Sequence, residues 1–481
     1  MGLGQAGARG SAITLGSQGV RFIAQIASIA ILARILPPSD FGLVTLVIAV
    51  ISVGELFRDF GLSTAAIQAG SLSNEEKNSL FWVNILIGLG LAGLVMMGAP
   101  LAALVFQEPL LSQLLPVTTA AFLINGFQAQ FRVELVRSLR FTAVALTELG
   151  GHLAGILAAI PLALSGAGVW SLVGQQLIAA TVICCSRVFA VRWRPNFSFS
   201  LKPAKKFLRT GSQLLVSLLL GYAATNADTV TIGLKLDAGQ LGIYSRAYQL
   251  VAAPVGQLLS PLTNVGLPLL TRVRSDSRKY AKYILSMFLP LAYTSALLFG
   301  FVIGSAQAIV QLLLGEGWED SARILALLAT GGIFQFMSHV GYWVFVSSGN
   351  AAAMMRYSLV THGISVLCII AGSFFGLPGV AMGYSLGLAM TWPIQVWWLQ
   401  KLVYIPVAQL MCTGFRALVL ALVCAAVGQL SSAVVDPPVL ACLIALLAQA
   451  IVVGVFFASG AYRRDFKRLL DSVALVRRKD P

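Results

Sequence analysis

The feature that most constrains this chain is a succession of apolar stretches, each about as long as a membrane crossing. A bilayer core takes about 20 apolar residues per helical crossing. Inside that core every backbone amide must be bonded within its own segment, so we expect each stretch to be a helix. Charge, proline or glycine bounds the stretches at 12–36, 41–66, 79–105, 110–131, 142–164, 168–190, 211–233, 241–270, 283–306, 321–346, 357–375, 377–400, 411–431 and 438–459. The sequence therefore predicts an all-α membrane protein with about 14 transmembrane helices.

Composition agrees with this and excludes a large soluble part. Hydrophobic residues make up 58% of the 481 residues and charged residues 11%, whereas soluble domains carry about 25% charged residues. The first apolar run is longer than the core of a signal peptide, so we expect it to be retained as the first helix.

The positions of the basic residues predict the orientation. Loops rich in Lys and Arg stay on the cytoplasmic side of a membrane. Of the 33 basic residues, 22 fall in alternate connections and in the tail, at 132–140, 187–209, 272–282 and 463–479. Both termini are therefore predicted to be cytoplasmic. The net charge of +15 then belongs beside the anionic inner leaflet, and we expect no nucleic-acid partner.

The chain also repeats itself. Gly16-Ser-Gln18 opens the first helix and Gly211-Ser-Gln213 opens the seventh. At a fixed offset of 200 residues the pairs are Leu36/Leu236, Phe41/Leu241, Gly42/Gly242 and Leu43/Ile243. We therefore expect two six-helix lobes in a parallel repeat. The expected divisions are an N-lobe at 1–190, a basic cytoplasmic linker at 191–210, a C-lobe at 211–400, helices 13 and 14 at 401–460, and a basic cytoplasmic tail at 461–481.

No motif of an enzyme is present in the sequence. There is no Walker loop, so ATP is not the direct fuel, and no paired acidic motif of a sugar-nucleotide transferase stands on a long loop. The six cysteines lie in or beside apolar stretches, which favours packing thiols over a disulfide or a metal site. We predict no enzyme, no cofactor and no bound metal.

Arginines inside apolar stretches are the candidate binding residues. Arg21, Arg58 and Arg246 lie on helices 1, 2 and 8. A charged side chain in lipid costs several kcal/mol unless it meets a partner or water. A guanidinium keeps its charge and offers a planar fork of donors that suits phosphate. We interpret the three arginines as the lining of a central cavity that binds anionic groups of a cargo.

Acidic residues in the same helices leave a second interpretation open. Arg21 would be neutralised by Glu55 or Asp59, and Arg246 by Asp228, as contacts that only hold the bundle together. Glu55, Asp59 and Asp228 are also candidates for a site that titrates or binds a coupling cation, and Glu148 adds a buried charge on helix 5. His339 is a candidate proton relay, although a hydrogen-bonded packing histidine explains it as well.

Several short motifs resemble those of a known family. They are Gly16-Ser-Gln18 with Arg21, Ala33-Arg-Ile-Leu-Pro-Pro-Ser-Asp-Phe-Gly42, Asp59-Phe-Gly-Leu-Ser-Thr-Ala65, Arg132-Val-Glu-Leu-Val-Arg-Ser-Leu-Arg-Phe141 and Leu314-Gly-Glu-Gly-Trp318. As a set they are similar to bacterial polysaccharide transporters, the exopolysaccharide and O-antigen flippases of the multidrug/oligosaccharidyl-lipid/polysaccharide exporter superfamily. Exporters of colanic acid, succinoglycan and xanthan form the most similar subgroup. The likeness spans about residues 10–400.

This resemblance implies a fold, a cargo and a location. The two lobes would enclose a central cleft and work by alternating access in the bacterial inner membrane. The cargo would be a polyprenyl-diphosphate-linked oligosaccharide repeat unit, moved from the inner to the outer leaflet within membrane lipid. Related flippases bind the diphosphate through arginines on helices 1, 2 and 8, the helices that carry Arg21, Arg58 and Arg246. The implied energy source is H+, Na+ or the membrane potential, and the implied partners are polysaccharide polymerase and export machinery.

Two other functions remain as alternatives. A cation-coupled multidrug antiporter of the same fold would carry a cationic cargo, and its cavity would be acidic rather than arginine-bearing. A membrane-embedded polysaccharide polymerase or transferase would present long outer loops with catalytic residues, whereas the outer loops expected here are short.

Overall fold

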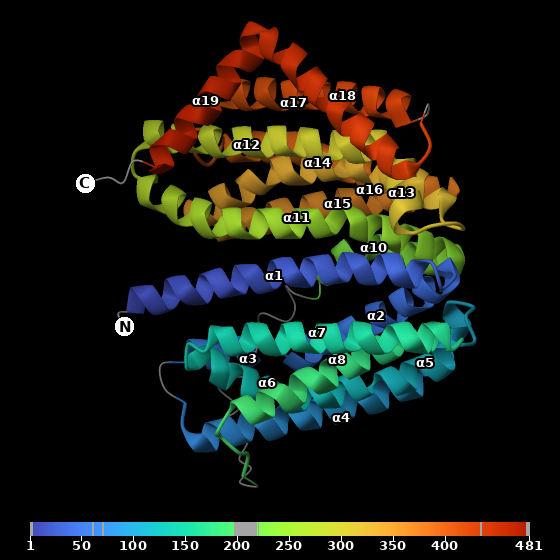
Figure 1. Ribbon diagram of the computed structural model, residues 1–481. Coiled ribbons are helices and arrows are strands. Elements are labelled where there is room, and N and C mark those ends of the chain that lie inside the picture. The colour runs from blue at the N-terminus through green and yellow to red at the C-terminus, as the bar shows by residue number, and fades with distance from the viewer. Residues whose placement is uncertain are drawn as a thin grey trace. The chain divides into compact units, whose positions relative to one another are not determined.

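The computed structural model describes residues 3–59, 62–69, 72–196, 219, 221–432 and 435–477. Within these ranges every regular element is a helix (Figure 1). The chain divides into two compact units, Met1–Gly242 and Ile243–Pro481, which we describe separately. The lobe boundaries expected from the sequence stay a prediction.

The first unit is a bundle of long helices with shorter ones at their ends. In Figure 1 the helices α4, α6, α7 and α8 lie side by side, and α7 packs against both α8 and α1. The helices of this unit are α1 (Leu3–Ala33), α2 (Pro38–Asp59), α3 (Leu62–Gln68), α4 (Asn74–Val105), α5 (Leu111–Thr118), α6 (Ala120–Arg137), α7 (Phe141–Leu164), α8 (Val169–Ala190), α10 (Ala227–Lys235) and the beginning of α11 (Ala238–Val273).

The second unit contains the rest of α11 and a bundle in which α12 packs against α14 and α17, and α16 packs against α14 and α15. Its core includes the fully buried side chains of Trp318, Trp343 and Phe336. The helices are α12 (Ser277–Gly304), α13 (Ala306–Leu313), α14 (Glu319–Ser347), α15 (Ala351–Ser373), α16 (Gly376–Leu399), α17 (Val407–Ser432), α18 (Pro438–Ala458) and α19 (Gly460–Arg477).

Eleven helices in the described part of the chain are long and apolar enough to cross a membrane. Their number and composition confirm an all-α, multi-pass membrane protein. Of the other three expected crossings, 377–400 forms α16, and 211–233 is described only at 219 and 221–233, where it contains most of α10. The exact number of crossings and the cytoplasmic position of the termini stay predictions.

The expected crossing at 110–131 is wrong as a single helix, because the chain forms α5 and α6 with Thr119 between them. Pro116 lies inside α5, and the Thr119 hydroxyl donates to the Pro116 carbonyl at 2.6 Å. An uninterrupted helix would give that carbonyl to the amide of residue 120. Proline and a back-bonding threonine both bend a helix at such a position.

The repeat at an offset of 200 residues has a direct structural counterpart. Gly42 in α2 and Gly242 in α11 contact each other's helix reciprocally. A Cβ atom on Gly42 would collide with the carbonyl oxygen of Ala238, and one on Gly242 would collide with that of Pro38. Only glycine allows two backbones to approach so closely. The matched pair therefore marks a helix crossing that a side chain at either position would disrupt.

Candidate functional site

A polar cavity of about 360 Å³ lies in the first unit. It is formed by α2, α3, α6 and α8, and its lining combines charged, amide and apolar side chains: Glu55, Leu56, Arg58, Ser63, Ile67, Asn125, Gln128, Ala129, Arg132 and Arg187. The residues at 58, 132 and 187 stand near the last turns of α2, α6 and α8. The cavity therefore sits at the end of the unit that the basic loops predict to be cytoplasmic.

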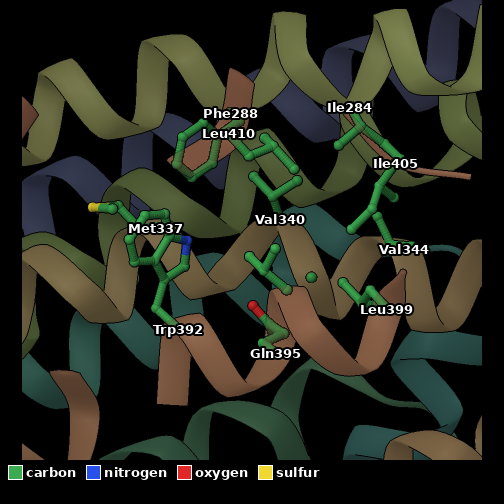
Figure 2. Close-up of a pocket in the computed structure, with 12 residues that line it drawn as sticks. Ile284, Phe288, Met337, Val340, Val344, Trp392, Gln395, Leu399, Ile405 and Leu410 are labelled. Atoms are coloured by element: carbon green, nitrogen blue, oxygen red, sulfur yellow. The ribbon is translucent and has the colours of Figure 1, made fainter. Parts of the chain in front are cut away.

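A second cavity, in the second unit, has a different character. Its volume is about 20 Å³, which is room for about one water molecule. Figure 2 shows apolar side chains around it, with the amide of Gln395 as a polar exception. Phe288 and Trp392 stack there with ring centroids 6.1 Å apart. This space is a small packing defect of the bundle and does not have the size of a binding site.

The hydrogen-bond network of the polar cavity begins in α2 with an ion pair between two residues one helical turn apart. Arg58 Nε donates to Glu55 Oε2 at 2.6 Å, and the Arg58 side chain is 11% exposed. The other carboxylate oxygen, Glu55 Oε1, accepts from Asn125 Nδ2 at 2.9 Å. Arg58 Nη1 also donates to the Asn125 backbone carbonyl at 3.4 Å. The end of α2 is thus joined to α6 by both members of the pair.

Two amides of α6 carry the network onward to α8. Gln128 Nε2 donates to Asn125 Oδ1 at 2.6 Å, and Arg187 Nη1 donates to Gln128 Oε1 at 2.8 Å. Asn125, Gln128 and Arg132 are spaced three and four residues apart, which places them on one face of the helix. The side chain of Arg187 is only 5% exposed, so its charge needs partners to be stable there.

Glu148 on α7 gathers three guanidinium groups at the far end of the network. Arg187 Nη2 lies 2.8 Å and Arg132 Nε 3.8 Å from Glu148 Oε1, while Arg21 Nη1 lies 3.9 Å from Glu148 Oε2. The Glu148 side chain is 30% exposed. Together with the pair in α2, the connected cluster has four guanidiniums and two carboxylates, a formal charge of +2. Such a surplus attracts an anion.

The structure brings four of the predicted site residues into this cluster. Glu55 and Arg58 line the cavity, and Arg21 and Glu148 join it through ion pairs. Arg21 contacts Glu148, whereas the neutralising partners expected from the sequence were Glu55 and Asp59. The side chain of Asp59 lies outside the described residues.

The other predicted site residues lie elsewhere. Asp228 in α10 is 3% exposed and accepts from the amide of Thr229 at 2.7 Å. Arg246 is half-buried in the part of α11 that belongs to the second unit. His339 in α14 shares a 2.9 Å hydrogen bond with the hydroxyl of Thr263, an arrangement that suits a packing histidine. Their assignment to binding or coupling stays a prediction.

Four network residues were missed in the sequence reading: Asn125, Gln128, Arg132 and Arg187. The two arginines were counted with the basic cytoplasmic connections. Arg187 nevertheless lies inside the expected stretch 168–190, with apolar residues on both sides. The polar residues at 125, 128 and 132 also form a helical stripe in an otherwise apolar segment. Both signals were available in the sequence.

The chain is similar in sequence to proteins of polysaccharide biosynthesis. The sequence pattern of a family described as "Polysaccharide biosynthesis protein" matches residues 31–323. Lipopolysaccharide biosynthesis protein WzxC of Escherichia coli (strain K12) is 26% identical over 365 residues, which cover 74% of this chain and 73% of that protein. Succinoglycan biosynthesis transport protein ExoT of Rhizobium meliloti (strain 1021) is 27% identical over 326 residues, covering 65% of this chain and 63% of that protein.

Solved structures share the fold at low sequence identity. The lipid II flippase MurJ in an inward closed conformation superposes with a TM-score of 0.74 at 15% identity, covering 94% of this chain and 99% of that chain. An inward-facing multidrug resistance MATE family transporter of the MOP superfamily gives a TM-score of 0.65 at 14% identity, covering 83% of this chain and 99% of that one. These likenesses confirm an all-helical fold of the kind seen in MurJ and in the MATE transporter.

The similar proteins are named as a biosynthesis protein, a biosynthesis transport protein and a flippase. The family pattern covers more than half of the chain, and the apolar helices give it many membrane crossings. This chain is a multi-pass protein of the bacterial inner membrane, it is not an enzyme, and it belongs to the polysaccharide biosynthesis protein family.

Proposed function

We propose that this protein is a flippase for a polyprenyl-diphosphate-linked oligosaccharide repeat unit. It would move the unit from the inner to the outer leaflet of the bacterial inner membrane, for exopolysaccharide or O-antigen assembly. The observation that carries the proposal is the arginine-rich cavity with its formal surplus of positive charge. The names of WzxC, ExoT and MurJ, and the fold shared with MurJ, support the same class of cargo.

The cavity suits the diphosphate end of such a cargo. Arg58, Arg132 and Arg187 line it from three different helices, so an anion inside would meet guanidiniums from several directions. Guanidinium-to-phosphate hydrogen bonds are charge-assisted and about twice as strong as neutral ones. Ligand pockets for small groups measure roughly 300–1,000 Å³, so this volume fits a diphosphate and its surroundings. The glycan would travel through water, with the polyprenyl tail in lipid.

The two glutamates would hold the arginines ready and then share them. Without cargo, Glu55 orients Arg58, and Glu148 holds Arg132, Arg187 and Arg21. An incoming diphosphate competes with these carboxylates for the same donors. Because the carboxylates remain beside the bound anion, they also weaken its grip, and a transporter has to release its cargo. Arg246 would receive the phosphate at a later stage of alternating access.

The coupling ion would be H+ or Na+. H+ and Na+ are both compatible with the carboxylates at Glu55, Asp59, Asp228 and Glu148, and His339 is a further proton acceptor by type. An antiporter for cationic drugs is the alternative that the MATE-like fold suggests. The positive surplus of the cavity disfavours a cationic cargo, so we place the flippase first.

The test combines genetics with lipid analysis. Deleting the gene should stop polymer export and leave polyprenyl-diphosphate-linked repeat units on the inner leaflet. Replacing Arg58 or Arg187 with Ala should reproduce that phenotype at normal protein levels. Lys at either position should restore polymer export only in part. Arg274→Ala is the matched control, because Arg274 is exposed on the surface. Normal export by both alanine variants would show that the cavity does not bind the cargo.

The arginines predicted from the sequence need the same experiment. Arg21→Ala should weaken export less than Arg58→Ala, because Arg21 joins the cluster only through a 3.9 Å ion pair. Arg246→Ala tests the proposed later site. If Arg246→Ala stops export but the purified variant still binds a polyprenyl diphosphate, Arg246 acts in later transfer, whereas loss of binding would show that it acts in first binding.

A further inference from the structure

The last helix of the described chain begins where a membrane crossing ends. The span Pro438–Ala458 forms α18, and α19 (Gly460–Arg477) follows it after Ser459 alone. With so short a connection, the first turns of α19 have to lie at the boundary between lipid and water. This placement follows from chain length and does not depend on the proposed function.

A buried carboxylate fastens α19 to the second unit. Asp465 is 2% exposed, and its Oδ2 accepts from Arg416 Nε at 2.9 Å and from the Tyr293 hydroxyl at 2.8 Å. Arg416 Nη2 lies 2.7 Å from the same oxygen. Arg416 belongs to α17 and Tyr293 to α12, so one side chain of α19 is held by two transmembrane helices. We call these three residues the Asp465 anchor.

A second set of contacts fixes how α19 is rotated. The Tyr462 hydroxyl donates to the backbone carbonyl of Arg416 at 3.0 Å. Tyr462 also packs edge to face on Phe456 of α18, with ring centroids 4.8 Å apart. Residues 462 and 465 are one turn apart and therefore share a face. The face that they occupy is the one turned toward the protein.

The remaining positions of the same two turns carry positive charge outward. Arg463, Arg464 and Lys467 are exposed. Phe466 is 43% exposed and packs on Phe457 with centroids 5.0 Å apart, which places an aromatic ring beside the cations at the end of the span. Basic residues together with an aromatic ring are what a helix at the surface of an anionic membrane presents.

We propose that α19 is a binding surface for anionic phospholipid headgroups. Arg463, Arg464 and Lys467 bind the headgroup phosphates, Phe466 sits at the level of the acyl chains, and the Asp465 anchor keeps this face toward the membrane. Because the anchor reaches α12 and α17, headgroup binding stabilises these helices as well. A membrane rich in anionic lipid should therefore stabilise the whole second unit.

The test uses the full-length protein in nanodiscs of phosphatidylcholine, with or without phosphatidylglycerol. We expect phosphatidylglycerol to raise the melting temperature of the wild-type protein. The triple variant Arg463→Gln, Arg464→Gln, Lys467→Gln should lose most of that shift, yet melt like the wild type in pure phosphatidylcholine. Replacing Arg463 and Arg464 with Lys should keep the shift, because the charge remains.

A control of equal charge distinguishes this site from a general attraction of cations to anionic lipid. Arg272, Arg274 and Lys282 are also exposed basic residues, and their triple glutamine variant should keep the shift. Equal loss of the melting-temperature shift in both triple variants would overturn the proposal. An unchanged shift in the α19 variant would also overturn it and would point to a protein partner for the basic face. Asp465→Asn should reduce the shift as well. It keeps Arg463, Arg464 and Lys467 but weakens the anchor that holds them toward the membrane.

Discussion

Glu148 offers the sharpest test of how the cavity works, through the isosteric change Glu148→Gln. The carboxylate lies between the guanidiniums of Arg187, Arg132 and Arg21, at 2.8, 3.8 and 3.9 Å. Glutamine keeps an oxygen that can accept from Arg187 and removes only the negative charge. The formal charge of the cluster then rises from +2 to +3.

The size of the effect follows from Coulomb's law. A phosphate on these arginines would lie on the order of 6 Å from the carboxylate, where two like charges repel by about 3 kcal/mol at an effective dielectric constant of about 20. The Glu148 side chain is 30% exposed, and water in the cavity screens part of this repulsion. We expect about half of this repulsion to remain after screening. Removing it with Glu148→Gln should therefore raise the affinity for the diphosphate roughly tenfold. The cost in folding stability should be on the order of 1–3 kcal/mol, because the hydrogen bond to Arg187 survives in neutral form but the buried Arg187 charge loses its balancing carboxylate.

The assay is binding of a polyprenyl diphosphate to the purified protein, followed by polymer export in cells. Glu148→Gln should bind about ten times more tightly and export more slowly, because release becomes harder. Glu75→Gln is the control: Glu75 is exposed in the first turn of α4, and the change alters the net charge equally. Unchanged or weaker binding by Glu148→Gln would refute the idea that this carboxylate competes with the cargo.

Three further predictions concern the scaffold. Arg137→Ala should lower the melting temperature, because Arg137 Nη1 donates to the carbonyls of Ala66 and Ala69 at 2.8 and 2.5 Å and so caps α3; a variant as stable as the wild type would contradict that reading. Gly42→Ala should abolish monodisperse protein in size-exclusion chromatography, since its Cβ would meet a carbonyl oxygen, whereas Gly90→Ala, with open space around it, should not. Asp276 caps α12, and the amide of Lys279 lowers its pKa below the ordinary 3.8. Its contribution to stability is therefore full above pH 3.8 and fades as the pH falls through the lowered value, so the melting temperatures of wild type and Asp276→Ala should converge in acid and differ at neutral pH.

The sequence predicted the membrane helices best where apolar runs end at strong breakers. Expected ranges 142–164, 168–190 and 438–459 became Phe141–Leu164, Val169–Ala190 and Pro438–Ala458. It failed at 110–131, where hydropathy is continuous but a proline and a back-bonding threonine break the helix. Average apolarity does not register such local hydrogen bonding.

The site was predictable only in part, for a different reason. Glu55, Arg58, Arg21 and Glu148 were visible as charges within apolar runs. Arg132 was missed because a basic residue near the end of a helix satisfies the positive-inside rule whether it faces a loop or a cavity. Its partner Glu148 lies on the next helix, and a linear pattern does not tell which side chains of neighbouring helices meet.

The two amides between α2 and α8 give the network a direction. Arg187 donates to Gln128, Gln128 donates to Asn125, and Asn125 donates to Glu55. A carboxamide both donates and accepts, so each acts as a relay where a second carboxylate or guanidinium would end the series. Removing the negative charge of Glu55, as in Glu55→Gln, would weaken the last acceptor, and we expect the altered polarisation to reach Arg187 through the two intervening amides. The affinity of the Arg187 guanidinium in α8 for an anion would then depend on the charge carried by Glu55 in α2.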